Sequence, residues 1–442
     1  MITLSILLLA LTFFVALLVF SGRNKLVFGA HTLPLYIVLL IYFLFFLVTP
    51  TYWHFKGEYV LFGNDLELYI PFAIVCYSVG LISLLVGYKL YPCNDKIRDE
   101  KSWLNIEVSR LSKRAIIFMF LSNLLLVMYW AQSSGYTIRA LFLLNVMQNS
   151  MVYEDIEVTT GPLYLFIESL IVTGVLVVLN DNISKPFKLI SGVLIFIIFI
   201  SLGFRFRMIL FIMILLYSHL CIKKFKSKDI RKVFLYLFLF CSILVSMSYL
   251  RNYVKQVNRG VEIELQTNER STLDTIFSST RNFYSFSSLV KHIDLGRGNY
   301  DYGETMFANI LYRFIPSSFF SNNIKPRPVG VEESAKSWGS VEGYYAGEAY
   351  SNFGDYYQAF GIFGVCVFNL IFGMILACIS NKIKKDQTVL SIGKFTLIVL
   401  SCSFFQMITR GYLPQYILIL IYLLIPIFCL QFLFRKINWS HI

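Results

Sequence analysis

Long apolar runs constrain this chain more than any other feature. A helix of about 20 residues crosses the hydrocarbon core of a bilayer. Eleven runs approach that length, and they cover residues 2–20, 32–49, 68–88, 114–132, 161–179, 187–202, 207–222, 232–250, 357–379, 389–408 and 412–434. The sequence therefore predicts an all-α polytopic membrane protein with about 11 transmembrane helices. The runs 187–202 and 207–222 are short, so a hairpin that does not fully cross is an alternative for this pair.

Basic residues predict the orientation, because short loops rich in Lys and Arg stay in the cytoplasm. The loops after the first, third, fifth, seventh and ninth runs are rich in these residues, as is the segment after the last run, and the alternate short loops are poor. This pattern places the N-terminus outside and the C-terminus in the cytoplasm. It also accounts for most of the net charge of +13. The sequence therefore predicts no nucleic-acid partner.

One outer loop, residues 251–356, is over a hundred residues long and divides the chain. Residues 1–250 carry the first eight predicted spans, and residues 357–442 carry the last three. Structureless loops of that length are uncommon. Two helices are predicted within it, one over 271–295 with Ser271 as N-cap, and one over 303–315 that Pro316 ends. The cytoplasmic loops are short, so any chemistry is expected at the outer face, periplasmic or extracellular.

Arginines gather where outer loops meet helices. The guanidinium group binds phosphate in a bidentate geometry, which makes a lipid diphosphate a natural ligand, although snorkelling to lipid headgroups is the alternative for each arginine. The membrane-edge arginines are Arg205, Arg207, Arg251 and Arg410, and the long loop adds Arg281, Arg313, Lys325 and Arg327. Glu168 lies inside the fifth predicted span, where a carboxylate needs a partner, so we expect it to pair with an arginine of the adjacent outer turns.

The stretch "GEAYSNFGDYYQAFGIFG", residues 347–364, joins the long loop to the ninth predicted span. Transfer of a sugar to a hydroxyl group needs a base for that hydroxyl and positive charge for a departing phosphate. Glu348 and Asp355 are the carboxylates at this boundary, and Tyr350 and Asn352 suit a sugar ring. Solvated charges and an interfacial aromatic belt are the alternative readings. We also expect Phe353 and Phe360 to pack the loop onto the helices.

No cofactor is predicted from the motifs. The histidines show no metal-ligand spacing, and neither a Walker motif nor the nucleophile and zinc-protease motifs stand in a usable place. The cysteines lie in apolar runs or in a cytoplasmic loop, which argues against a cysteine metal site and against disulfides.

Three blocks carry a resemblance to a known family: "GFRFRMIL" (203–210), "YGETMFANILYRFIPSSFF" (302–320) followed by "KPRP", and the boundary stretch. Together with the topology they resemble the Wzy-type oligosaccharide repeat unit polymerases of O-antigen and capsule synthesis. The resemblance implies a GT-C-like fold in the bacterial cytoplasmic (inner) membrane, surrounded by membrane lipid. It also implies glycan transfer from undecaprenyl diphosphate to the non-reducing end of another lipid-linked repeat, without metal or nucleotide sugar. A chain-length regulator is an implied partner.

On this reading, the residues expected to be catalytic are Glu348, Asp355, Arg205 and Arg313. Those expected to bind the substrate or its diphosphate are Arg207, Arg251, Arg281, Lys325, Arg327, Asn352, Tyr350 and Arg410. An O-antigen ligase shares the topology and the arginines, and a histidine in the long loop, His292, keeps that alternative open. A lipid-linked oligosaccharide flippase would favour charged spans and short loops, and a membrane O-acyltransferase would need an intramembrane histidine in a better place than His219.

Overall fold

The computed structural model describes residues 1–21, 31–61, 64–91, 106–133, 163, 165–201, 205–222, 273–274, 277, 280–315, 319–320, 350–385 and 390–439. These residues are mostly helical, which confirms the all-α prediction. Within these described ranges, six helices are long and apolar enough to cross a membrane: Leu33–Phe55, Ile70–Leu90, Lys113–Ser133, Ser351–Ile383, Ile392–Arg410 and Leu413–Phe432. Every predicted run overlaps a helix except 232–250, which lies outside the described residues. The count of eleven spans and the GT-C-like fold remain predictions.

The described residues fall into two compact units. Unit 1 contains α1 (Ile2–Ser21), α2 (Leu33–Tyr42), the π-helix η1 (Phe43–Val48), α3 (Thr49–Phe55), the antiparallel pair β1 (Val60–Leu61) and β2 (Asn64–Asp65), α4 (Ile70–Leu90), α13 (Asn282–Asp294), the π-helix η6 (Glu304–Ala308), α14 (Asn309–Phe314) and α16 (Ser351–Lys385). Unit 2 contains the 3-10 helix η3 (Val108–Arg110), α5 (Lys113–Ser133), α8 (Phe166–Leu179), α9 (Lys185–Ser201) and α10 (Arg205–Ile222). The helices α17 (Ile392–Arg410) and α18 (Leu413–Trp439) each contribute one part to each unit.

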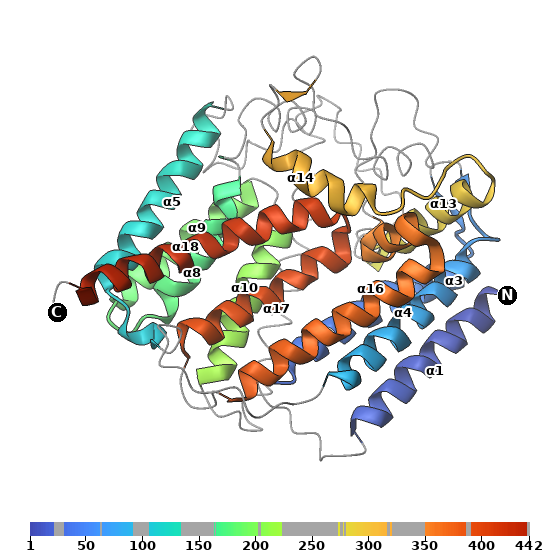
Figure 1. Cartoon of the computed structure of the whole chain (residues 1–442), viewed down its shortest axis with the longest axis horizontal. Helices are drawn as coiled ribbons and strands as arrows, with labels where there is room; N and C mark the ends of the chain where they lie inside the picture. Colours follow the sequence, from blue (N-terminus) through green and yellow to red (C-terminus); the bar gives the residue numbers. More distant parts are fainter. Residues whose placement is uncertain are drawn as a thin grey trace. The chain divides into compact units, whose positions relative to one another are not determined.

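In unit 1, α4 lies between α1 and α16 (Figure 1). Glycines bring α4 and α16 close together. A Cβ atom on Gly87 would overlap the carbonyl oxygen of Leu370, and one on Gly373 would overlap that of Leu84. Small residues at helix contacts are how membrane helices gain packing energy, because lipid tails offer no hydrophobic drive for association. The pair α4–α16 is therefore the tightly packed centre of unit 1.

An aromatic cluster fills the space around that pair. The ring of Phe353 lies 4.8 Å from Tyr77, 5.0 Å from Phe46 and 5.4 Å from Tyr42, measured between centroids. Phe353 is fully buried, as the sequence predicted for a residue that packs onto the helices. Edge-to-face ring pairs of this kind contribute about 0.5–1.5 kcal/mol beyond the area that they bury.

The helix α16 bends at Phe360 and Gly361, where the backbone leaves helical values. Gly361 has φ +62°, a conformation that costs glycine little. Before the bend, residues 350–359 are all buried, whereas Phe360, Ile362 and Phe363 are exposed. The ring of Phe360 is 39% exposed, so the bend leaves part of it at the surface. Among the described residues, its ring centroid lies 6.1 Å from that of Phe368 on α16 and 6.5 Å from that of Tyr302 in the long loop, so Phe360 packs the loop against the helix as predicted.

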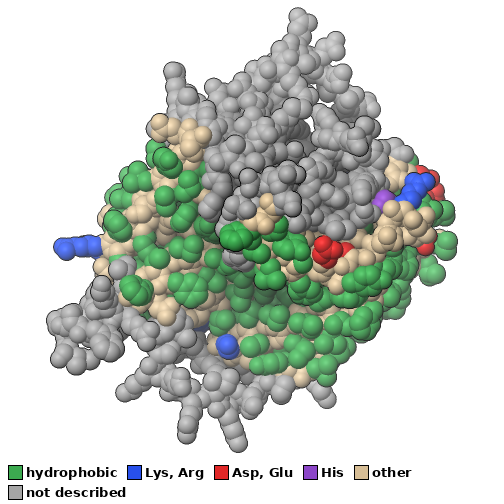
Figure 2. Space-filling model, turned by 45° about the horizontal axis from the view of Figure 1, so that its top comes forward, with side chains coloured by type: hydrophobic (Ala, Val, Ile, Leu, Met, Phe, Trp, Pro, Cys, Tyr) green, Lys and Arg blue, Asp and Glu red, His purple; other side chains and the backbone are tan. Residues whose placement is uncertain are grey.

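Hydrophobic side chains cover much of the described surface on the face that Figure 2 shows. On α1, for example, Leu4, Leu7 and Leu11 are more than half exposed, and on α5 the same holds for Phe118 and Leu125. Apolar surfaces of this extent are not stable in water but suit lipid. The exposed faces therefore agree with a multi-pass membrane protein.

The long loop contributes helices in the predicted places, with one difference. The predicted helix over 303–315 is present as η6 and α14, and Ile315 is extended because a residue before proline is pushed away from helical values. Of the helix predicted over 271–295, residues 273, 274 and 277 are helical, and after a break at Thr280 and Arg281 the longer part is α13. Ser271, its predicted N-cap, lies outside the described residues. Residues 282–290 of α13 are all buried, because the helix packs against α4 and α16.

In unit 2, α8 is surrounded by α5, α9 and α10. Its residues 167–177 are buried on every side, and Gly174 accommodates Ile195 of α9. Glu168 is completely buried, and its Oε1 lies 2.6 Å from Nε of Arg207 on α10. The pairing predicted for Glu168 is confirmed.

Candidate functional site

Ten consecutive buried residues, Tyr350 and the first nine residues of α16, form what we call the polar segment of α16. Helices normally bury one face and expose the other, but this segment buries every side chain although its sequence, "YSNFGDYYQA", is largely polar. Buried polar groups are costly unless they find hydrogen-bond partners. The polar segment is therefore where a functional site is expected in unit 1.

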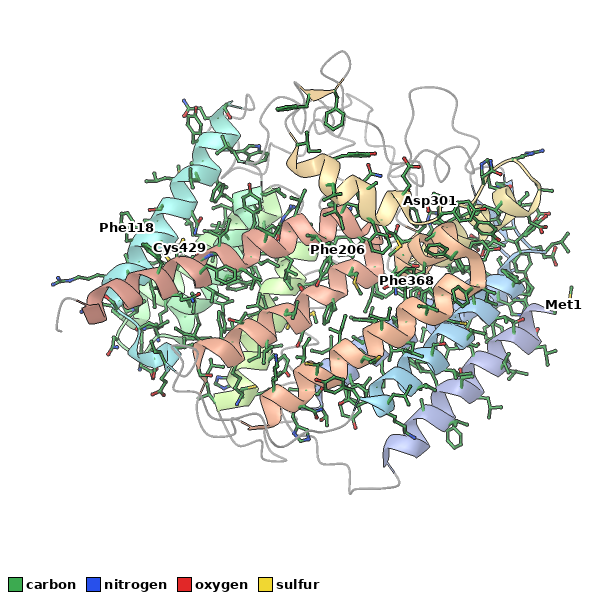
Figure 3. All side chains as sticks on the ribbon, in the orientation of Figure 1. Met1, Phe118, Phe206, Asp301, Phe368 and Cys429 are labelled. Atoms are coloured by element: carbon green, nitrogen blue, oxygen red, sulfur yellow. The ribbon has the colours of Figure 1, made fainter. Side chains whose placement is uncertain are left out.

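Two turns are tied to the polar segment. Asp355 accepts the backbone N–H of Leu413 through Oδ2 at 2.9 Å, which fixes the turn between α17 and α18. The side chain of Gln358 donates from Nε2 to the backbone carbonyl of Asn299 at 2.6 Å. The backbone carbonyl of Gln358 accepts the N–H of Asp301 at 3.0 Å. Figure 3 labels Asp301 close to the bent end of α16. Residues more than fifty positions apart in sequence thus meet around one helical segment.

The turn between α17 and α18 is strained where it touches α16. Ser351, Gly411 and Tyr412 all have left-handed backbone conformations, with φ values of +64°, +66° and +55°. A Cβ atom on Gly411 would lie 2.5 Å from the carbonyl oxygen of Ser351, so only glycine fits there. Strained residues other than glycine persist only where the surrounding structure holds them, which is common at functional sites.

The Asp301 turn leads into α14. The carboxylate of Asp301 accepts the N–H of Gly303 at 2.9 Å and the N–H of Thr305 at 3.2 Å. These bonds satisfy donors at the start of the helical segment η6–α14, which no preceding turn can serve. The turn therefore fixes where α14, the helix that contains Arg313, begins.

A chain of hydrogen bonds runs from α16 through α2. Asn352 donates from Nδ2 to the hydroxyl of Tyr42 at 3.2 Å, and that hydroxyl donates to Oδ1 of Asn369 at 2.9 Å. Asn369 in turn donates from Nδ2 to the carbonyl of Val365 at 2.8 Å. Because a carbonyl only accepts, this last bond sets the direction of the whole chain.

Several polar atoms of the segment have no hydrogen-bond partner among the described residues. They are the hydroxyl of Tyr350, Oγ of Ser351, Oδ1 of Asn352, Oδ1 of Asp355 and Oε1 of Gln358. The side chains of Asn352, Asp355 and Gln358 are 1%, 4% and 1% exposed. Burial raises the pKa of Tyr350 well above its usual value, and the nearby Asp355 carboxylate raises it further. The Tyr350 hydroxyl therefore stays protonated and able to donate a hydrogen bond.

The structure brings together only some of the residues that the sequence singled out. Tyr350, Asn352 and Asp355 lie together in the polar segment, and Arg410 is exposed at the end of α17, beside the turn that Asp355 holds. Arg281 is the N-cap residue of α13.

The other predicted residues lie elsewhere. Arg207 is buried against Glu168 in unit 2, where the ion pair already neutralises its charge. Arg205 and Arg313 lie in α10 and α14, but their side chains are not described. Glu348, Arg251, Lys325 and Arg327 lie outside the described residues.

Sequence reasoning missed four contributors: Tyr42, Gln358, Asn369 and the Gly411 turn. Asn369 carried a usable signal, since an amide inside an apolar run needs a partner. Tyr42 carried none, because it stands in a run of aliphatic and aromatic residues that all suit a membrane span.

The fold and the site together define a multi-pass helical membrane protein with a buried polar segment. Among the described residues, no group of three His, Cys, Asp or Glu side chains is placed to hold a metal ion. The chain belongs to the O-antigen polysaccharide polymerase Wzy family, whose model matches residues 2–438. The family resemblance seen in the sequence is thereby confirmed. Searches of curated proteins and of solved structures returned no match.

Proposed function

We propose that this protein joins oligosaccharide repeat units carried on undecaprenyl diphosphate into O-antigen or capsular polysaccharide. The reaction takes place at the outer face of the bacterial inner membrane, with the N-terminus of the chain outside and the C-terminus in the cytoplasm. The family match over nearly the whole chain carries this proposal, since that family consists of O-antigen polymerases. The long outer loop and the scarcity of charge in the predicted spans support it.

The chemistry is a glycosyl transfer between two lipid-linked glycans. A hydroxyl oxygen at the non-reducing end of the acceptor repeat attacks the anomeric carbon of the donor glycan. The bond between that carbon and the phosphate oxygen breaks, and undecaprenyl diphosphate leaves with the electron pair. The hydroxyl proton passes to a carboxylate, for which Asp355 and Glu348 are the candidates.

Asp355 suits the role of proton acceptor. Its Oδ2 is held by the N–H of Leu413, which fixes the carboxylate, while Oδ1 has no partner among the described residues. A carboxylate fixed in this way needs no reorganisation when the hydroxyl proton arrives.

The leaving diphosphate requires positive charge. Arg205 and Arg313 are proposed to stabilise the charge that develops on it, and the remaining basic residues are proposed to bind it: Arg251, Arg281, Lys325, Arg327 and Arg410. Bidentate guanidinium contacts suit both phosphate groups. Arg207 is proposed to contribute through its ion pair with Glu168, which holds the first turn of α10, the turn that begins at Arg205. A chain-length regulator is a proposed partner.

Glycan laddering in cells tests the proposal. A strain that lacks the gene is complemented with wild type, Arg205→Ala, Arg313→Ala, Glu348→Ala or Asp355→Asn at matched protein levels. We expect the deletion strain to carry a single repeat on its surface acceptor and wild type to restore the ladder. Long polymer retained on undecaprenyl diphosphate in the deletion strain would instead identify a ligase. Loss of all lipid-linked repeats from the outer face would identify a flippase.

A matched control uses a carboxylate of the same unit outside the site. Glu67 lies between β2 and α4 and its side chain is exposed. Glu67→Gln changes the charge by the same amount as Asp355→Asn, so it should leave the ladder unchanged.

A further inference from the structure

The unpartnered atoms of the polar segment include a set of one chemical kind. Asn352, Asp355 and Gln358 are spaced three apart on α16, and side chains at that spacing are neighbours on a helix surface. Each uses one atom to bind the protein, and each leaves one oxygen without a partner among the described residues. We call these three oxygens the acceptor row.

The protein itself determines that these atoms are oxygens rather than amide nitrogens. Gln358 contacts the carbonyl of Asn299, which only accepts, so its nitrogen faces that carbonyl and Oε1 faces away. Asp355 faces the N–H of Leu413, and as a carboxylate it has no nitrogen to present. Two of the three members of the row, Asp355 and Gln358, thus have a fixed polarity.

The polarity of Asn352 is set from a distance. The carbonyl of Val365 requires the nitrogen of Asn369, so Oδ1 of Asn369 accepts from Tyr42. The Tyr42 hydroxyl, having donated its hydrogen, accepts from Nδ2 of Asn352. Oδ1 of Asn352 is the atom left over. Tyr42 and Asn369 therefore act through Asn352 as positioning residues.

We propose that the acceptor row binds the hydroxyl groups of the acceptor glycan, and that Tyr42 and Asn369 keep the row uniformly accepting. A ligand for three oxygens must supply hydrogen-bond donors, and a sugar supplies them from adjacent hydroxyls. A diphosphate has only acceptor oxygens once ionised, so the row excludes it. This inference rests on the proposed function, and it assigns Asn352, which the sequence had singled out as suited to a sugar ring, to the acceptor glycan.

The first test needs no variant. The free repeat-unit oligosaccharide is released from its lipid by mild acid, and its binding to the purified full-length protein in nanodiscs is measured by calorimetry. The same oligosaccharide with methylated hydroxyls keeps its oxygens but loses its donors. We expect methylation to weaken binding at least about tenfold, the factor that corresponds to one lost hydrogen bond. Equal binding of both forms would overturn the proposal.

The second test uses variants that remove an acceptor oxygen at similar volume. Asn352→Leu and Gln358→Met should each raise the Kd for the oligosaccharide about tenfold. Tyr42→Phe keeps the ring in the aromatic cluster but frees the Asn352 amide to rotate, so it should raise that Kd by a smaller factor. All three should bind inorganic pyrophosphate as wild type does. Unchanged oligosaccharide binding with weakened pyrophosphate binding would refute the acceptor row.

Ser380→Ala is the control, because Ser380 is also buried on α16 and its hydroxyl also has no hydrogen-bond partner among the described residues. It lies at the other end of the helix and should change neither Kd. Polymer formation from extracted lipid-linked repeats is measured in parallel. If the protein binds the oligosaccharide through the acceptor row but forms no polymer, the proposed function is wrong and the acceptor row is still supported.

Discussion

Substitution of Asp355 separates catalysis from support of the fold. Asp355→Asn preserves the size of the side chain, and its remaining oxygen can still accept the N–H of Leu413, which lies 2.9 Å from Oδ2. The atom in place of Oδ1 becomes an amide nitrogen, which donates and takes up no proton. General base catalysis typically contributes a factor of about 10²–10⁴. We therefore expect Asp355→Asn to fold normally and to polymerise at least about a hundredfold more slowly.

Asp355→Ala removes both functions. It leaves the N–H of Leu413 without its acceptor in a part-buried place, and an unsatisfied buried donor costs about 1–3 kcal/mol. The alanine variant should therefore lose activity and also unfold at a lower temperature than the asparagine variant. The comparison between the two variants isolates the hydrogen bond from the charge.

The assay follows polymer formation by the purified protein in nanodiscs and follows unfolding by fluorescence-detected size exclusion after heating. Glu67→Gln serves as the control for loss of one carboxylate. If Asp355→Asn polymerised at the wild-type rate, Asp355 would serve only to hold the turn between α17 and α18. Glu348 would then be the remaining candidate for the base.

Three further predictions concern packing. Glu168→Gln or Arg207→Met should each lower stability by about 3–5 kcal/mol, since each leaves a buried charge, while the double variant should recover part of that loss in the same heating assay. Gly411→Ala should abolish polymerisation and lower the unfolding temperature, because its φ of +66° and the 2.5 Å approach to the neighbouring carbonyl exclude a Cβ atom; wild-type laddering would contradict this geometry. Gly87→Ala should lower the free energy of unfolding by about 1–3 kcal/mol, because its Cβ atom pushes α4 away from α16. Gly192→Ala, which has open space around it, should leave that free energy unchanged or raise it.

The sequence predicted the helices well because the bilayer imposes a simple rule on them. A span must be apolar over a fixed length and must satisfy its own backbone, so composition along the chain is sufficient. The predicted ninth span shows where that rule stops. It began at residue 357, whereas α16 begins at Ser351 and bends at Gly361. The polar segment before the bend is helical because α13 and α4 bury it. The hydropathy of the sequence does not show which helices will pack there, so it could not predict this part of the helix.

The candidate site was predicted in part. The boundary stretch stood out because polar residues and aromatics stand together where a membrane run begins, and Asp355, Asn352 and Tyr350 do lie together there. The arginines were selected by their positions between loops and helices. Position along the chain did not reveal that Arg207 turns inward to Glu168.

By itself, the sequence determined the membrane class, the helical architecture and the family, since each depends on local composition or on short blocks of residues. Only the tertiary structure decided which polar atoms of α16 are already bound and which remain available. That decision depends on Tyr42, which is 310 residues from Asn352 and 327 from Asn369. Hydrogen bonds across such separations form only when the helices have packed, because nothing local in the chain requires them.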